Sequence, residues 1–110
     1  MSGTNGTRDE TPSTGVGDPD PCQKKRRGPI NSPKAPVLSK LAVGAVLDVN
    51  VQLSGTIPIL IVASGGQNAG SLTFVGYLEI IDCIQNRGVK YKATIISISG
   101  GVYEVRVEPR

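Results

Sequence analysis

The chain contains no histidine among its 110 residues, and this removes much of the common catalytic chemistry at once. Histidine supplies the general base of serine and cysteine triads, and it is a usual ligand of catalytic zinc. The two cysteines, Cys22 and Cys83, cannot by themselves complete a four-ligand zinc site. The sequence therefore predicts a protein that is not an enzyme and that uses no metal or cofactor.

The carboxylates offer no alternative route to catalysis. Glu79 and Asp82 lie three residues apart on one face of a predicted helix, and Glu104 and Glu108 flank Arg106 on a predicted strand. Acid–base catalysis needs surroundings that shift the pKa of one carboxylate, and neither pair is expected to lie among residues that would desolvate it. We expect both pairs to be solvated surface groups.

Both cysteines are expected to be free thiols. Cys22 falls in a polar segment, and Cys83 falls on the polar side of the predicted helix. The amino-terminal residues do not resemble a signal peptide, so the sequence predicts a reducing, cytoplasmic location. The longest apolar run, residues 57–63, is much shorter than the ~18 residues that a membrane span requires, so no membrane partner is expected.

The strongest candidate for a functional element is a run of four adjacent cations, Lys24 to Arg27. Residues 21–40 contain six bases and no acid. Such a segment binds a polyanion by displacing its counterions. Two other interpretations stay open: a solubilising tail, or a nuclear-import signal if the source is eukaryotic.

A second candidate contact is Lys90-Tyr91-Lys92, in which an aromatic residue lies between two lysines. In single-strand-binding sheets, bases stack on exposed aromatic side chains beside cations. The alternative is that Tyr91 belongs to the core or its rim and that both lysines are solvated. The predicted nucleic-acid contacts are therefore Lys24, Lys25, Arg26, Arg27, Lys34, Lys40, Lys90, Tyr91 and Lys92.

The glycine-rich segment at residues 64–71 is a candidate loop for an anion or a protein partner. Its central residues are Gly65, Gly66, Gln67 and Asn68. Backbone N–H groups that precede a helix N-terminus, expected here at Thr73, can receive a phosphate or carboxylate. The segment lacks the Lys-Ser/Thr ending of a Walker loop. A plain turn, in which glycine supplies positive φ, is the alternative.

A break in composition near residues 35–41 predicts that the chain is divided into an amino-terminal arm and a folded domain. Residues 1–37 are rich in Pro, Gly and Ser and are predicted to be a disordered arm with a basic cluster. Residues 38–110 are predicted to form a small α+β domain with the order ββ-α-ββ, as a curled antiparallel sheet or partial barrel. The expected elements are strands over 46–53, 57–63, 90–98 and 102–108, and a helix between Thr73 and Gly88 with Leu78 on its apolar side.

Residues 43–107 resemble HIRAN domains, which are small β-rich modules found with DNA helicases and nucleases. The resemblance rests on Val43-Gly44-Ala45-Val46-Leu47, on the apolar strand Ile59–Ala63, on Ala69-Gly70-Ser71-Leu72 before the helix, and on Gly88-Val89-Lys90-Tyr91-Lys92-Ala93. The Asn-Pro-x-Asp loop of that family is absent and no Tyr follows Gly70, so no binding residue is transferred.

Taken together, the sequence predicts a non-enzymatic accessory module that associates with nucleic acid through a basic arm and a small β-rich domain. The alternative is a protein–protein adaptor or inhibitor that uses an exposed strand edge or the glycine-rich loop.

Overall fold

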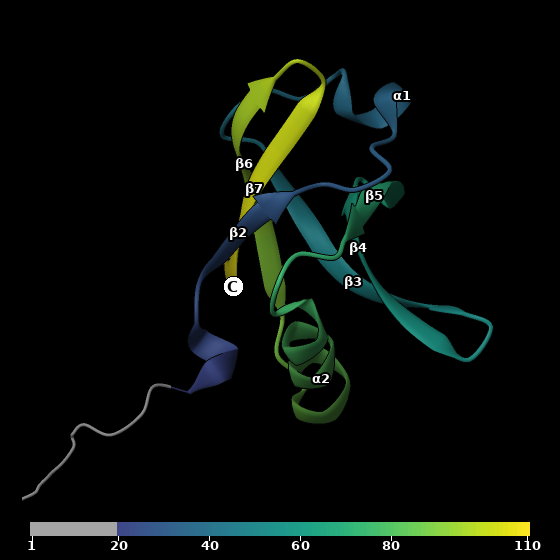
Figure 1. Ribbon diagram of the computed structural model, residues 1–110, viewed down its shortest axis with the longest axis vertical. Helices are drawn as coiled ribbons and strands as arrows, with labels where there is room; N and C mark the ends of the chain where they lie inside the picture. Colours follow the sequence, from purple (N-terminus) through teal and green to yellow (C-terminus); the bar gives the residue numbers. More distant parts are fainter. Residues whose placement is uncertain (1–19) are drawn as a thin grey trace, which may run out of the picture.

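The computed structural model describes residues 20–110, so the first part of the predicted arm lies outside the described residues. Two short helical segments, η1 and α1, lie on either side of the first strand in the sequence, and one longer helix, α2, lies below the sheet (Figure 1). The elements are η1 (Pro21–Gln23), β2 (Arg26–Pro29), α1 (Ala35–Leu38), β3 (Val46–Ser54), β4 (Ile57–Ser64), β5 (Gln67–Leu72), α2 (Tyr77–Arg87), β6 (Tyr91–Ser99) and β7 (Val102–Pro109).

The described residues form one six-stranded sheet with the order β2-β7-β6-β3-β4-β5, and every neighbouring pair is antiparallel. No continuous ladder closes the sheet. Its two edges are joined at a single bridge, where Asn31 and Ser71 exchange backbone hydrogen bonds of 2.8 and 2.9 Å. The predicted α+β class and curled antiparallel sheet are confirmed, but the sheet has two more strands than expected.

The first additional strand, β2, lies in the segment predicted to be disordered. It pairs with β7 from Arg26 opposite Val107 to Pro29 opposite Glu104. The domain boundary predicted at residue 38 is therefore wrong, because residues 20–37 already belong to the fold. The sequence of β2 contains no apolar run that would predict a strand. This segment is ordered by contacts with residues that are distant in the sequence.

The second additional strand, β5, replaces part of the predicted glycine-rich loop. Gly65 and Gly66 have φ values of 57° and 83° and connect β4 to β5. Two consecutive positive φ angles are what a type I′ hairpin turn requires, and glycine adopts them without a steric penalty. The sequence Gly-Gly therefore makes a tight turn, and the residues after it continue as a strand.

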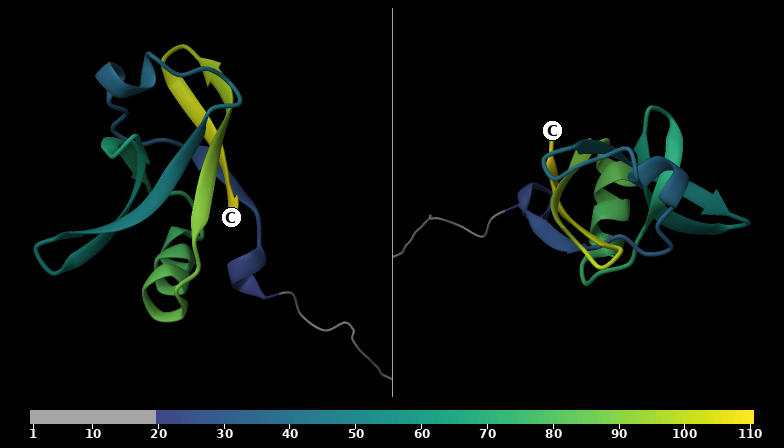
Figure 2. Two further views of the ribbon diagram at one scale, coloured as in Figure 1. Left: turned by 180° about the vertical axis from the view of Figure 1, so that it is seen from behind. Right: turned by 90° about the horizontal axis from the view of Figure 1, so that it is seen from above.

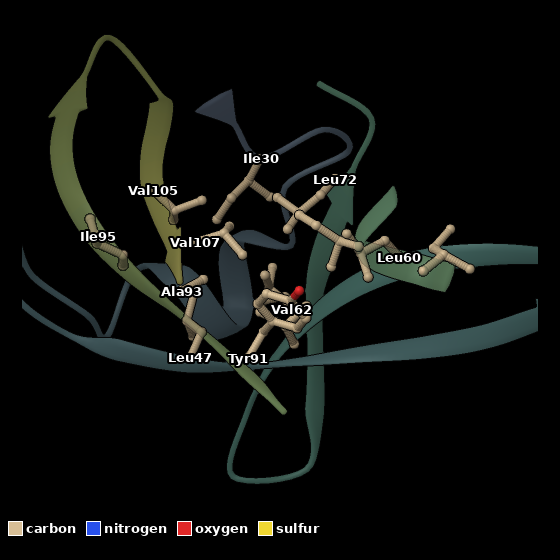
Figure 3. Close-up of a cluster of buried hydrophobic side chains, with 14 of the residues drawn as sticks. Ile30, Leu47, Leu60, Val62, Leu72, Tyr91, Ala93, Ile95, Val105 and Val107 are labelled. Atoms are coloured by element: carbon tan, nitrogen blue, oxygen red, sulfur yellow. The ribbon is translucent and has the colours of Figure 1, made fainter. Parts of the chain in front are cut away.

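The core lies on the inner face of the curled sheet. Alternate residues of β3, β6 and β7 point inward, as their period of two predicts, and Figure 3 shows their side chains meeting those of β4 and β5. Helix α2 covers this face from below, as the two further views show (Figure 2). The fully buried side chains include Leu38, Leu47, Leu60, Val62, Leu72, Ile80, Ile95, Val105 and Val107.

Helix α2 begins at Tyr77, four residues after the expected cap, and ends at Gly88 as predicted. Phe74 lies before the helix and packs against β2, where a Cβ atom on Gly28 would be 2.6 Å from the Phe74 ring. Leu78 is exposed and Cys83 is buried, so both predictions for these side chains are wrong. The buried side of the helix is rotated toward Cys83, which is bonded to Cys22 of η1, and away from Leu78.

Beyond the sheet, the β3–β4 hairpin continues as a two-stranded ribbon. Strand β6 pairs with β3 only over residues 46–49, and β5 pairs with β4 only from Leu60 onward. Residues 50–59 therefore have a partner on one side only, and Figure 1 shows this part of the hairpin extending away from the body. We call residues 50–59 the free ribbon.

The close approach of Gly70 to the chain segment after β2 leads to a first prediction. A Cβ atom there would collide with the Ile30 side chain and lie 2.9 Å from the Asn31 carbonyl oxygen. We expect Gly70→Ala to lower the free energy of unfolding by about 1–3 kcal/mol more than Gly44→Ala. Gly44 is the matched control, because it also has a positive φ but faces open space. Equal losses in denaturant titrations would show that the bridge between the sheet edges is not tightly packed.

Candidate functional site: the charged face of the sheet

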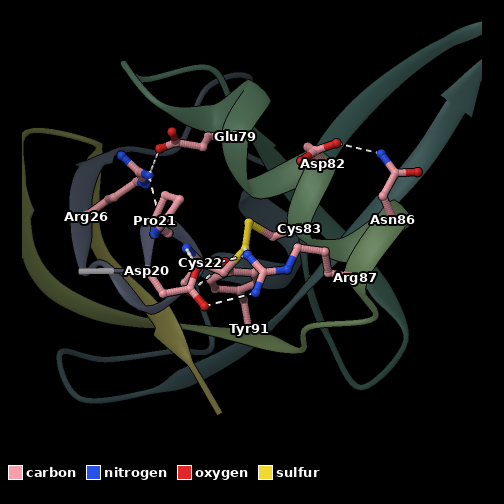
Figure 4. Close-up of a disulfide and its surroundings, with 10 residues drawn as sticks. All are labelled: Asp20, Pro21, Cys22, Arg26, Glu79, Asp82, Cys83, Asn86, Arg87 and Tyr91. Carbon is pink, nitrogen blue, oxygen red and sulfur yellow. Dashed lines mark hydrogen bonds and ion pairs between the residues drawn. A yellow bond between two sulfur atoms is a disulfide. The ribbon is translucent and has the colours of Figure 1, made fainter. Parts of the chain in front are cut away.

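The segment that carries the basic run is held to the body by a set of contacts around η1. We call residues 20–29, which contain η1 and β2, the strap. Cys22 and Cys83 form a disulfide, and the Tyr91 hydroxyl donates to the Cys22 carbonyl at 2.7 Å (Figure 4). The Arg87 guanidinium donates to both carboxylate oxygens of Asp20 at 2.9 and 3.0 Å. These contacts fix the start of β2 against the end of α2.

The prediction of two free thiols is therefore wrong. It assumed that Cys22 lies in a disordered segment, whereas η1 places its side chain in the core beside Cys83. Both cysteines are almost completely buried, and Arg87 covers the Cys22 sulfur. The pairing could not be derived from spacing alone, because the two residues are separated by 61 positions.

The disulfide is expected to contribute strongly to stability, because it closes a long loop in the unfolded chain. For a separation of 61 residues, loop-closure entropy gives about 4 kcal/mol. We expect the Cys22→Ser/Cys83→Ser variant to lose about 2–4 kcal/mol of unfolding free energy in denaturant titrations. Reduced wild-type protein is the control and is expected to lose a similar amount. An unchanged midpoint in both would contradict the role of the strap.

Asp20 provides a pH-dependent part of the same anchor. The hydrogen bonds from Arg87, and then that from the Cys22 backbone N–H, lower the pKa of the Asp20 carboxyl. A lowered pKa means that the ionised carboxylate stabilises the folded state at neutral pH. This stabilisation is lost as the pH falls below the ordinary value of about 3.9 and through the lowered one.

We therefore expect Asp20→Asn to destabilise the protein at pH 7, with a difference from wild type that shrinks below about pH 4. Asparagine still accepts the Cys22 N–H, so the variant tests the charge rather than the cap. The measurement is the free energy of unfolding between pH 2.5 and 7. A difference that stays constant over this range would contradict the lowered pKa of Asp20.

Two of the predicted contact residues are part of this anchor and are not free to bind a ligand. Tyr91 is only 3% exposed, so it cannot stack on a base, and the prediction of a stacking contact is wrong. Burial raises the pKa of its phenol. The Arg26 side chain is 10% exposed and forms an ion pair with Glu79. Its Nε atom is buried without a hydrogen-bond partner among the described residues.

Two other cations of the run, Lys25 and Arg27, lie on the outer face of the sheet. Arg27 of β2 is directly opposite Arg106 of β7. On the other side of β7, Lys92 of β6 is opposite Glu108. Alternation along each strand turns these side chains away from the core. We call this outer surface of β2, β7, β6 and β3 the charged face. Its charged residues are Lys25, Arg27, Asp48, Lys92, Glu104, Arg106, Glu108 and Arg110.

Like charges directly opposite one another destabilise a strand pair, and the two arginines avoid this by using separate carboxylates. Arg27 Nε lies 3.2 Å from Glu104, and Arg106 Nε lies 3.0 Å from Glu108. The hydrogen bond from Arg106 lowers the pKa of the Glu108 carboxyl, and the nearby charges of Lys25 and Lys92 act in the same direction. Glu108 is thus the anion at the centre of the basic group.

These ion pairs leave the guanidinium groups available to a stronger anion. Arg27 is 67% exposed and Arg106 is 45% exposed at the side chain. Exposed salt bridges contribute little free energy because water and salt screen them, so a phosphate can replace a carboxylate at small cost. The charged face carries five bases against three acids, and it therefore keeps a positive excess when all pairs are formed.

The other predicted cations do not join this face. Lys34 caps α1 and lines a small cavity with Ile59, Ile61 and Asn68, on β4 and β5. Lys40 follows α1 and is exposed, and Lys24 lies between η1 and β2 near Glu79. Lys90 lies in the turn before β6, beside a separate cavity. The predicted set of nine residues is thus divided among several surfaces.

The glycine-rich segment does not form the predicted anion loop. Gly65 and Gly66 are the exposed turn of a hairpin, whereas Gln67 and Asn68 begin β5. The Asn68 side chain accepts the Gly70 N–H at 2.8 Å. Because α2 starts only at Tyr77, the turn does not adjoin a helix N-terminus, and the expected anion geometry is wrong. Its use as a contact for a protein partner stays a prediction.

The sequence analysis did not include Arg106 among the nucleic-acid contacts and placed it only between Glu104 and Glu108 on a predicted strand. The alternation of Tyr103, Val105 and Val107 correctly predicted that Arg106 points outward. What it lacked was the partner strand, since the contact with Arg27 joins residues 79 positions apart. Only the register between β2 and β7 brings the two arginines together.

Within residues 20–110, no group of three or more His, Cys, Asp or Glu side chains is arranged to hold a metal ion. None of the helices in this part of the chain has the length and apolar character needed to cross a membrane.

Comparison with known proteins gave no match of any of the three kinds. The chain matches no protein-family model, no curated protein and no solved structure. The resemblance to HIRAN domains stays a prediction.

Proposed function

We propose that the protein is a non-enzymatic binding module that associates with nucleic acid through the charged face. The observation that carries this proposal is the pair Arg27 and Arg106, which are opposite one another and exposed on adjacent strands. Two guanidinium groups side by side can bind neighbouring phosphates, and each binds a phosphate in bidentate fashion. Lys25 and Lys92 extend the positive surface on either side of Glu108.

The charged face differs in one respect from the flexible basic arm that the sequence predicted. Arg27 is held in a strand, so its position relative to Arg106 is set before any ligand binds. Preorganised cations lose less conformational entropy on binding than cations on a disordered segment. The proposed contacts are all to phosphate, so we expect weak dependence on base sequence. The resemblance to HIRAN domains points in the same direction.

The test measures binding of the intact chain to a duplex and to a single strand of DNA over a range of salt concentrations. If Lys25, Arg27, Lys92 and Arg106 each contact a phosphate, log K should fall against log salt with a slope of about −3.6 for duplex and about −2.8 for single strands. Arg106→Gln should weaken binding and flatten the duplex slope by about 0.9. Glu108→Gln should strengthen binding, because it removes the central anion.

Lys34→Gln is the matched control for Lys92→Gln. Both variants remove one lysine charge, but Lys34 lies against β4 and β5, outside the charged face. We expect a loss only for Lys92→Gln. Negligible binding at low salt, or equal losses for the two variants, would contradict the proposal.

A cytoplasmic location remains part of the proposal, and one observation opposes it. Buried disulfides are typical of oxidising compartments, whereas cytosolic thiols are usually kept reduced.

A further inference from the structure

The two edges of the free ribbon differ in their backbone hydrogen-bonding groups. On the β6 side, the Ile95 N–H donates to the Ala45 carbonyl at 2.9 Å, so these two residues form a pair joined by one backbone hydrogen bond, and the Ala45 carbonyl points toward β6. In an antiparallel ladder such pairs recur at every second residue, so the N–H and C=O groups of residues 47, 49, 51 and 53 point to this side. Strand β6 begins at Tyr91, opposite Val49. The backbone groups of Val51 and Leu53 therefore face an edge with no neighbouring strand.

The opposite edge of the ribbon is closed to strand pairing by Pro58. Ser54 and Ile57 close the two-residue turn, so the same alternation turns the backbone of residue 58 away from β3. Proline has no N–H to donate, and it is a common protection against strand addition at a sheet edge. The edge of β3 has no such protection, because residues 50–57 contain neither proline nor a charge.

The side chains along the open edge are partly apolar. Leu53 lies on the same face as Val49 and Val51 and is 62% exposed. An exposed, uncharged strand edge with an apolar face is the surface to which extended peptides add as a further strand. We call the open edge at Val51–Leu53 the β3 edge.

The β3 edge leads into a cavity at the place where β6 begins. This open cavity has a volume of about 320 Å³ and lies between Asn50 of β3, Ile84 of α2 and Lys90 before β6. Arg110 also lines it and forms an ion pair with Asp48. Lys90 has no ion pair with any residue from 20 to 110 and is exposed. The cavity therefore offers an uncompensated cation at the end of an open strand edge.

We infer that the β3 edge binds the carboxyl-terminal segment of a partner protein as an additional antiparallel strand. A peptide antiparallel to β3 runs in the same direction as β6, so its last residue meets the start of β6 and places the terminal carboxylate beside Lys90. A peptide parallel to β3 would instead place its positively charged amino terminus beside Lys90. The expected ligand has apolar residues at alternate positions, opposite Val51 and Leu53, and a free carboxylate.

A second copy of this chain is the competing occupant. Two β3 edges could pair antiparallel about Gln52, but such a pair would leave the cation in the cavity without an anion. The charge at Lys90 therefore favours the peptide. Asp48 and Arg110 of the charged face also line this cavity, but none of the four cations on which the nucleic-acid proposal rests does, so the two proposals can fail separately.

The first experiment selects peptides from a displayed library of random octapeptides with free carboxyl termini, using the full chain as bait. We expect the selected sequences to alternate apolar and polar residues. One selected peptide and its carboxamide are then compared by fluorescence anisotropy. The carboxamide should bind at least tenfold more weakly. Lys90→Gln should weaken binding of the acid but not of the carboxamide, and Lys34→Gln should change neither.

The second experiment tests the backbone pairing. Val51→Pro removes one unpaired N–H and should abolish peptide binding. Because the Val51 side chain packs against the core, its loss should lower the melting temperature, and Val51→Ala, which should still bind the peptide, is the control for this loss. If this variant does not fold, amide exchange in the wild-type protein decides the question. The Val51 and Leu53 amides should exchange rapidly in the free protein and become protected when the selected peptide binds.

Three results would overturn the inference. The library could return no sequence that binds above an unrelated peptide, or the carboxamide could bind as tightly as the acid. Alternatively, light scattering could show a dimer that Val51→Pro dissociates, which would assign the edge to a second copy of the chain.

Discussion

The attachment of the strap to the end of α2 is the constraint on which the rest of the structure depends. A disulfide, a two-fold Arg87–Asp20 hydrogen bond and the Tyr91 hydroxyl all meet at η1. A strand of four residues with two arginines, a glycine and a proline has little intrinsic tendency to pair. The anchor lowers the entropic cost of bringing this strand to β7, because the chain just before it is already fixed in place.

This anchoring has a consequence for charge. Without β2, the outer face of β7 would present Arg106 between Glu104 and Glu108 and would carry a net negative charge. Pairing with β2 adds Arg27 opposite Arg106 and brings Lys25 next to Glu108, which makes the face positive. The surface that we propose for nucleic acid is thus assembled from two segments that are distant in sequence, and the disulfide supports it indirectly.

The edges of the sheet are not equally protected against pairing with a further strand. One end is covered where Asn31 and Ser71 join β2 to β5, and glycine at position 70 allows the two segments to come this close. In the free ribbon, Pro58 protects β4, whereas β3 keeps its donors and acceptors. Because an unprotected edge invites aggregation, a soluble domain normally covers or charges it. The uncovered edge lies beside Lys90, which has no ion pair within residues 20–110, and this is the physical reason to look for a partner strand.

The sequence by itself determined most of the local elements of residues 46–110, with the exceptions of β5 and the start of α2. Alternation of apolar and polar residues located β3 and β7, β-branched residues located β6, and Gly88 marked the end of α2, because these signals depend only on neighbouring residues. Only the tertiary structure decided that residues 20–37 belong to the fold, that Cys22 and Cys83 are paired, and that Tyr91 is buried. These features arise from contacts between segments about 60 to 80 positions apart, and no local pattern of side chains encodes such a register. The same limit applies to the candidate site. Composition identified the cations, but strand pairing chose which of them share a surface.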